Sequence, residues 1–162
     1  MAREAKILNA KDILSGEQGE LWASFDGKDM CVMHAKNIEA TVSYDKEQVP
    51  ILGKRGKGNR KTGATYSGSM TLYYVESIFR KYAEKYKDEG EDFYFDLKVI
   101  NHDATTHTGK QIVVLRDCNF DELVLAKLDA DSSVLDEDVS FTFEDWYIEN
   151  EGFDILDGFF DE

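Results

Sequence analysis

The chain has 162 residues, of which 42% are hydrophobic, so it can bury one packed core and is not disordered as a whole. Its 33 acidic and 19 basic residues give a net charge of −14, which disfavours binding to nucleic-acid phosphates and anionic membranes. The only cysteines, Cys31 and Cys118, are too few for a disulfide scaffold. No apolar run is long enough to span a bilayer, and the first residues lack the apolar stretch of a signal peptide. We therefore expect a single cytoplasmically synthesised domain over residues 1–162.

The first 45 residues begin with a polar arm and continue as strands. Residues 1–19 form the arm, with one small apolar cluster at Ile13 and Leu14. Leu21, Ala23 and Phe25 then alternate with polar neighbours up to an Asp-Gly turn signal, which predicts a hairpin whose second strand covers about residues 30–35.

Two later segments, 38–45 and 66–74, show the clearest alternation in the chain. In each, apolar or aromatic residues such as Ile38, Val42, Met70 and Leu72 occupy every second position. Period-2 alternation predicts strands with one buried face and one hydrophilic face. The predicted hydrophilic face comprises Glu39, Thr41, Ser43, Asp45, Ser67, Ser69 and Thr71.

Between these strands lies the most basic part of the sequence. Residues 46–64 contain four glycines and a cluster of five cations, namely Lys54, Arg55, Lys57, Arg60 and Lys61. The composition predicts a long solvated loop, and structureless loops of this length are usually functional. A cationic island on an anionic chain favours contact between copies, so we interpret this cluster as an assembly loop.

One helix is predicted over residues 77–88. Phe79, Tyr82 and Tyr86 recur at helical spacing, Ser77 is placed to cap the start, and Gly90 follows the end. We expect this aromatic stripe to be buried against a sheet.

The remainder predicts more strands, at 93–100, 111–115, 120–128 and 139–143, with a bulge near Asp145 and an acidic tail over 149–162. The expected fold is mainly β in the α+β class. It is an antiparallel β-sandwich or barrel with one covering helix and the long basic loop.

The sequence provides no motif for catalysis or for a cofactor. It lacks the nucleotide-binding, zinc-protease and serine-hydrolase signatures, and the glycine-rich run from Gly53 to Arg60 lacks the ending of a phosphate loop. His102, Asp103 and His107 are the best metal candidates, but zinc needs three or four convergent ligands and neither cysteine lies near them in sequence. We expect no catalytic residues, no metal and no cofactor.

Several stretches, taken in order, resemble the tail-tube proteins of contractile phage tails and of PBSX-type phage-like particles. They are NAKDILSG from Asn9, KNIEATV from Lys36, TGATYSGSMTLYY from Thr62, FYFDL from Phe93, AKLDAD from Ala126 and DVSFTFED from Asp138. The acidic tail after Ile148 has no match.

This resemblance implies a small β subunit that forms hexameric rings stacked into a hollow tube. The implied partners are other copies of the chain, a sheath, a baseplate and a tape-measure protein, and DNA passes through the lumen only if the particle is a phage. The implied location is the bacterial cytoplasm during assembly and then the tail of a phage or phage-like particle. Two alternatives stay open: a monomeric β-barrel that binds a small apolar ligand, and a carboxylate-based hydrolase.

Overall fold

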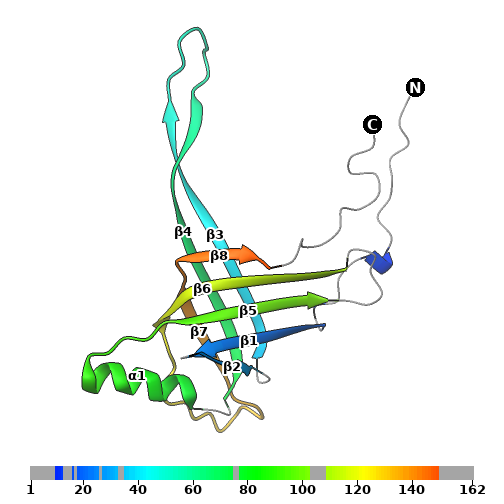
Figure 1. Cartoon of the computed structure of the whole chain (residues 1–162), viewed down its shortest axis with the longest axis vertical. Coiled ribbons are helices and arrows are strands. Elements are labelled where there is room, and N and C mark those ends of the chain that lie inside the picture. Colours follow the sequence, from blue (N-terminus) through cyan, green and yellow to red (C-terminus); the bar gives the residue numbers. More distant parts are fainter. Residues whose placement is uncertain are drawn as a thin grey trace. The chain divides into compact units, whose positions relative to one another are not determined.

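The computed structural model describes residues 10–12, 16, 18–25, 27–32, 35–74, 77–102 and 109–149. The chain divides into two compact units. Unit 1 combines Met1–Met33, Phe95–Arg116 and Trp146–Glu162, and unit 2 combines His34–Tyr94 and Asp117–Asp145. The described part is mainly antiparallel β-sheet with one α-helix, which confirms the predicted fold class (Figure 1).

Unit 1 is built around a short antiparallel sheet. It holds β1 (Gly19–Phe25), β2 (Lys28–Cys31), β5 (Phe95–His102), the first part of β6 (Lys110–Glu122) and β8 (Asp145–Ile148), with a short 3-10 helix at Ala10–Asp12. β1 pairs with β2 on one side and with β5 on the other. The predicted alternation in β1 is confirmed, because Leu21, Ala23 and Phe25 are buried. Phe25 stacks on Phe95 with the ring centroids 5.3 Å apart.

Unit 2 contains the longest strands. It holds β3 (Ala35–Val49), β4 (Gly58–Tyr73), β7 (Asp136–Thr142), the second part of β6 and the helix α1 (Ile78–Glu89). β4 lies between β3 and β7 and pairs antiparallel with both. One face of this sheet carries fully buried residues, including Met70, Leu72, Val139 and Phe141. This burial explains the apolar half of the alternation in β4. β3 differs from the predicted strand with one buried face, because Ile38 and Val42 are only half-buried and Tyr44 is exposed.

The helix α1 confirms the predicted element within one residue at each end, but its stripe is only partly buried. Phe79 is buried against Phe120 with ring centroids 5.0 Å apart, and Tyr82 stacks on Phe93. Tyr86, in contrast, is 56% exposed, because the packing contacts of the helix are concentrated in its first two turns. Gly90 ends the helix in the left-handed region as predicted, whereas the Ser77 side chain makes no capping hydrogen bond.

The strand order is β2-β1-β5-β6-β7-β4-β3, with β8 pairing β6 outside this path. The end strands of this order, β2 and β3, do not pair with each other, so the described strands form an open sheet and not a closed barrel. No described helix is long and apolar enough to cross a membrane.

The segment 46–64 differs from the expected long loop. β3 continues to Val49 and β4 starts at Gly58, so only residues 50–57 lie outside the strands. Ladder pairing continues from Lys46 opposite Lys61 to Val49 opposite Gly58, after an irregularity between Asp45 and Lys46. Backbone pairing satisfies these polar groups without any apolar core, which is why a hydrophobic pattern could not reveal the strands.

The region 111–128 also differs from the prediction of two strands. β6 is a single strand, and Asp117 adopts a positive φ of 53° within it. The strand therefore runs through the polar residues that indicated a break, with a local irregularity at Asp117. Residues 123–128 lie outside any strand. In place of the bulge predicted near Asp145, β7 ends at Thr142 and β8 begins at Asp145. Most of the N-terminal arm and the tail beyond Glu149 lie outside the described residues.

Candidate assembly surfaces

The predicted polar residues of unit 2 share one face of the sheet. In the β3–β4 ladder Glu39 is opposite Ser69 and Thr41 is opposite Ser67. Residues 43 and 45 on β3 and 71 on β4 follow in the same alternation, so all seven predicted residues lie on one side. The Thr41 hydroxyl donates to the Ser67 carbonyl oxygen at 3.4 Å.

This polar face continues onto β7, beyond the seven residues predicted from the sequence. Ser69 is opposite Ser140, and Thr71 is opposite Asp138. The Thr71 hydroxyl donates to Asp138 Oδ1 at 2.7 Å. The alternation of Ser140 and Thr142 was visible in the sequence, but the sequence does not reveal that β7 pairs with β4.

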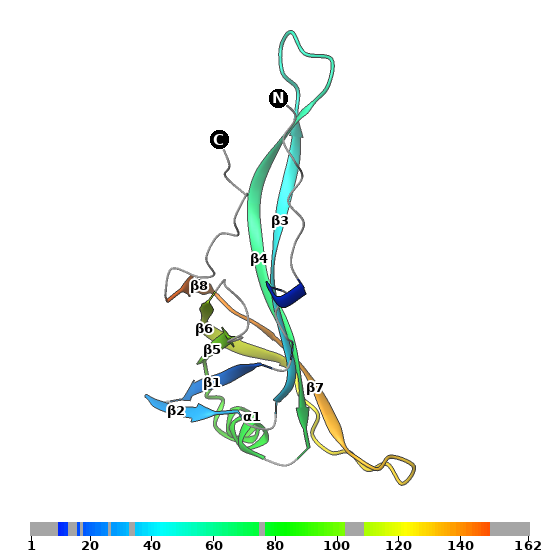
Figure 2. The same ribbon diagram turned by 90° about the vertical axis from the view of Figure 1, so that its right-hand side faces the viewer.

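The predicted assembly loop forms the end of the long β3–β4 hairpin, which extends beyond the part of β4 that pairs with β7 (Figures 1 and 2). We call residues 49–61 the hairpin tip. Lys54, Arg55 and Lys57 lie in the turn, and Arg60 and Lys61 lie on β4. The Lys61 ammonium lies 3.7 Å from the centre of the Tyr44 ring. The five predicted cations are therefore exposed together at one end of unit 2.

The hairpin tip also exposes apolar side chains that the charge pattern concealed. Leu52 is fully exposed, and Val49 and Ile51 are also exposed. A cluster of apolar side chains on a solvent-exposed turn is typical of a surface that contacts a partner. The tip thus combines positive charge with apolar surface.

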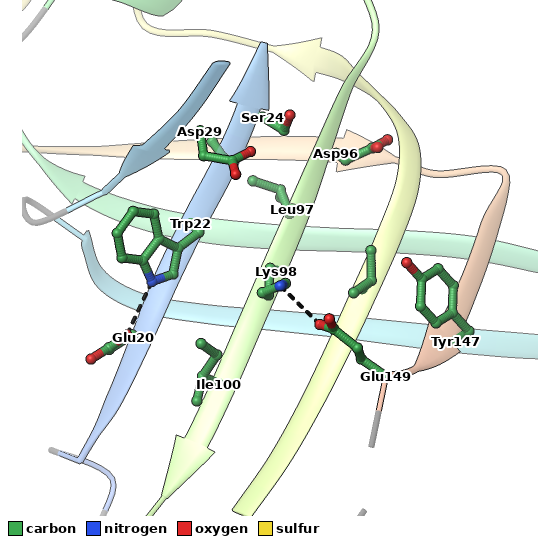
Figure 3. Close-up of a pocket in the computed structure, with 12 residues that line it drawn as sticks. Glu20, Trp22, Ser24, Asp29, Asp96, Leu97, Lys98, Ile100, Tyr147 and Glu149 are labelled. Carbon is green, nitrogen blue, oxygen red and sulfur yellow. Dashed lines mark hydrogen bonds and ion pairs between the residues drawn. The ribbon is translucent and has the colours of Figure 1, made fainter. Parts of the chain in front are cut away.

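Unit 1 carries a depression of about 510 Å³ on the polar side of β1 and β5 (Figure 3). Its lining includes Trp22 and Tyr147, four carboxylates and one ammonium group. The Trp22 indole donates to Glu20 at 3.0 Å, and the Lys98 ammonium lies 2.8 Å from Glu149. The sequence alone does not reveal this site, because its residues come from strands far apart in the chain. We call it the unit 1 groove.

The hydrogen bond to the Glu149 carboxylate raises the pKa of Lys98 above its usual value of 10.5. Partial desolvation acts in the opposite direction, and the charges of Glu149 and Asp29 add to the increase. The ammonium form is therefore favoured in the folded protein. The pair ties the segment after β8 to β5, although both side chains are partly exposed to screening by solvent.

Replacing Lys98 with Gln is expected to destabilise the protein by no more than about 1 kcal/mol at pH 7, because the pair is partly exposed. A raised pKa contributes stability below pH 10.5 that is lost as the pH rises through the folded-state pKa. The wild-type advantage should therefore disappear above that value. Thermal unfolding from pH 7 to 11, followed by tryptophan fluorescence, checks this, with Lys87→Gln as an exposed control. A difference that is constant with pH would contradict it.

The described residues contain no group of three or more potential metal ligands. His102 is exposed at the end of β5, and its predicted companions Asp103 and His107 lie outside the described residues.

These surfaces define the class of protein: a chain built on an open β-sheet, with one polar sheet face and a projecting charged hairpin. The model of the family described as phage tail tube protein matches residues 6–149. The chain belongs to this family, which confirms the resemblance found in the sequence.

Similar proteins agree with this assignment. The chain is 41% identical over 139 residues to the uncharacterized protein YqbM of Bacillus subtilis and 40% identical to the phage-like element PBSX protein XkdM of the same organism. Each match covers 86% of this chain and 92% of the relative. A chain in the structure of an extracellular contractile injection system, the PVC sheath-tube complex, shares the fold with a TM-score of 0.64 at 7% identity. That match covers 86% of this chain and 93% of the other.

Proposed function

We propose that this protein is a non-catalytic structural subunit of a tail tube. Copies assemble into hexameric rings, and the rings stack into a hollow tube with a hydrophilic lumen. The observation that carries the proposal is the continuous polar face of β3, β4 and β7 in a member of the tail tube family.

The polar face has the chemistry that a channel wall requires. It comprises Glu39, Thr41, Ser43, Asp45, Ser67, Ser69 and Thr71, and Asp138 extends it. These residues include three carboxylates and no cation, so a lumen lined by them repels nucleic-acid phosphates and does not retain a passing strand. On the opposite face β4 and β7 carry the buried residues Met70, Leu72, Val139 and Phe141, so in that part of the sheet this face is the polar side.

The open edge of β3 fits the same function. Within the described strands β3 pairs only with β4, so one side of a 15-residue strand has no ladder partner. Exposed edges of this length invite pairing with another chain, and closing a ring of subunits protects them.

The remaining partners follow from the family and stay part of the proposal. They are a sheath around the tube, a baseplate and a tape-measure protein. The protein assembles in the bacterial cytoplasm and then resides in the tail of a phage or phage-like particle, with DNA in the lumen only in a phage.

Electron microscopy of the concentrated purified protein tests this function. We expect rings or tubes in negative stain, and a three-dimensional reconstruction of the tubes should place Ser43 and Ser69 on the channel wall. Small monodisperse particles at all concentrations would contradict the tube. A reconstruction with these serines on the outer surface would contradict the lumen assignment. The alternative of a small-ligand β-barrel requires an enclosed apolar interior, which the open sheet does not supply.

A further inference from the structure

The two ends of the β4 strand in unit 2 carry opposite charge. The hairpin tip lies at the Gly58 end, with five basic residues and no acidic residue between positions 48 and 62. At the other end, Tyr73 is opposite Asp136, the first residue of β7. The connection from β6 to β7, residues 123–135, therefore emerges about 50 Å from the tip, at about 3.3 Å per residue along β4 (Figure 2).

We call residues 123–135 the acidic loop, because it carries Asp129 and Asp131 and is flanked by Asp121, Glu122 and Asp136, against one ammonium group, that of Lys127. Asp129 and Asp131 are exposed at its turn. The single cation, Lys127, is engaged within the loop, since its ammonium donates to the Asp136 carbonyl oxygen at 2.8 Å and lies 3.6 Å from the Asp136 carboxylate. The charge that the loop presents to a partner is therefore negative.

The acidic loop also matches the hairpin tip in apolar surface. Leu128 is 97% exposed, and Leu125 and Val134 are exposed beside it. Leu52, Ile51 and Val49 are their counterparts at the tip. Each end alone leaves large apolar side chains in water, so contact between two such ends would remove both sets from solvent.

The acidic loop is held in shape before any partner arrives. The Asp131 amide donates to Asp129 Oδ1 at 3.0 Å, and the Ser132 hydroxyl donates to the Val134 carbonyl oxygen at 2.6 Å. Arg80 of α1 donates to the Val124 carbonyl oxygen at 3.4 Å. A loop fixed in this way loses little conformational entropy on binding.

We propose that the hairpin tip of one copy docks onto the acidic loop of a second copy, and that this contact joins successive subunits along the tube axis. The proposal rests on the proposed tube function and adds the acceptor surface to it. Because the two surfaces differ and lie at opposite ends of one strand, the contact is heterologous and does not close between two copies. Such contacts propagate into open assemblies, as stacking of rings requires.

Disulfide cross-linking tests the contact directly. Leu52→Cys and Leu128→Cys are introduced into one chain in a Cys31→Ser background, in which the remaining thiol, Cys118, is buried. Since a disulfide requires Cα atoms about 4.4–6.8 Å apart, we expect mild oxidation to give a ladder of dimers, trimers and larger species on non-reducing gels. Each single variant has one accessible cysteine and should therefore give no product larger than a dimer. A mixture of the two single variants should also give the mixed dimer, which a contact within one chain cannot produce.

Charge reversal supplies the second readout. Lys54→Glu with Arg55→Glu, and separately Asp129→Lys with Asp131→Lys, should each abolish sedimentable tubes at low salt, and combining the two pairs should restore them. The matched control is Glu20→Lys with Asp29→Lys in the unit 1 groove, which changes the net charge by the same amount as the acidic-loop variant. This control should not abolish tubes, and it should not restore them when combined with Lys54→Glu and Arg55→Glu.

The outcomes separate the two proposals. If the wild type forms tubes but positions 52 and 128 do not cross-link, or if the groove variant rescues the tip variant, the acidic loop is not the acceptor and the tube function stands. If the wild type forms neither rings nor tubes, the tube function fails. In that case the cross-link ladder still decides whether copies associate end to end.

Discussion

Replacing Glu137 with Gln is expected to lower the free energy of unfolding by about 3 kcal/mol. Glu137 is 3% exposed and forms an ion pair with Arg80, whose side chain is also largely buried. Arg80 keeps its contacts to the Tyr74 ring and the Val124 carbonyl oxygen in the variant, but its charge loses the carboxylate. Removing one partner of a buried pair typically costs about 3–5 kcal/mol, because the remaining charge loses a carboxylate that offsets its desolvation.

Equilibrium urea unfolding followed by circular dichroism measures this effect, because Trp22 and Trp146 both lie in unit 1 and report poorly on this pair. Glu91→Gln is the matched control. Its pair with Lys85 is exposed, so we expect a change of no more than about 1 kcal/mol. Changing both partners, with Glu137→Leu and Arg80→Met, should recover much of the loss. A Glu137→Gln variant as stable as the control would show that the Arg80 charge is solvated without its partner.

The second large effect is expected at Gly68, where Ala should destabilise the sheet by about 1–3 kcal/mol or prevent folding. Gly68 is opposite Ala40 on β3 and Phe141 on β7. A Cβ atom there would lie 2.5 Å from the Phe141 ring and 2.9 Å from the Glu39 carbonyl oxygen. Phe141 is fully buried and the oxygen belongs to the backbone, so neither atom can move away without disturbing the sheet.

Gly63→Ala on the same strand is the control for this prediction. Its added Cβ would meet only Asp45 Oδ2, at an ordinary 3.5 Å, so we expect no loss of stability. Adding Phe141→Leu to Gly68→Ala should recover part of the stability in a double-mutant cycle, because the ring is the closer of the two obstacles. Thermal unfolding of the wild type, Gly68→Ala, Phe141→Leu and the double variant measures the coupling. Equal melting temperatures for Gly68→Ala and Gly63→Ala would mean that β3 and β7 can separate to admit a methyl group.

Both predictions concern the support of the proposed lumen wall. The Arg80–Glu137 pair links α1 to β7, and Gly68 allows the close approach of β4 to its neighbours. The polar face lies on these same strands. A variant that fails to assemble is therefore informative about assembly only when circular dichroism shows a native sheet.

Local side-chain periodicity determined the class of the fold and several of its elements. The apolar positions of β1, the alternation at the Met70 end of β4 and Phe79 at the start of the aromatic stripe each reflect whether a side chain faces a core or water. The alternation of β3 marks the strand correctly although none of its side chains is buried. This requirement acts on each strand or helix separately, so it is readable without knowledge of its neighbours. The polar face was predicted for the same reason.

Pairing between distant segments decided what periodicity left out. The hairpin through residues 46–64 exists because backbone groups of β3 and β4 pair where few side chains are buried, and hydrogen bonds leave no hydrophobic pattern. β6 continues through Asp117 despite its positive φ, and the exposure of Tyr86 depends on where α1 contacts the sheet.

The candidate surfaces divide in the same way. The five cations of the hairpin tip are neighbours in sequence, so composition alone identified them as a cluster. The acidic residues near position 129 were equally visible, but only the pairing of Tyr73 with Asp136 places them at the opposite end of β4 from the tip. Sequence determined the charges because charge belongs to each residue. Tertiary structure decided their arrangement, because the position of one strand end relative to another depends on the register of the whole sheet.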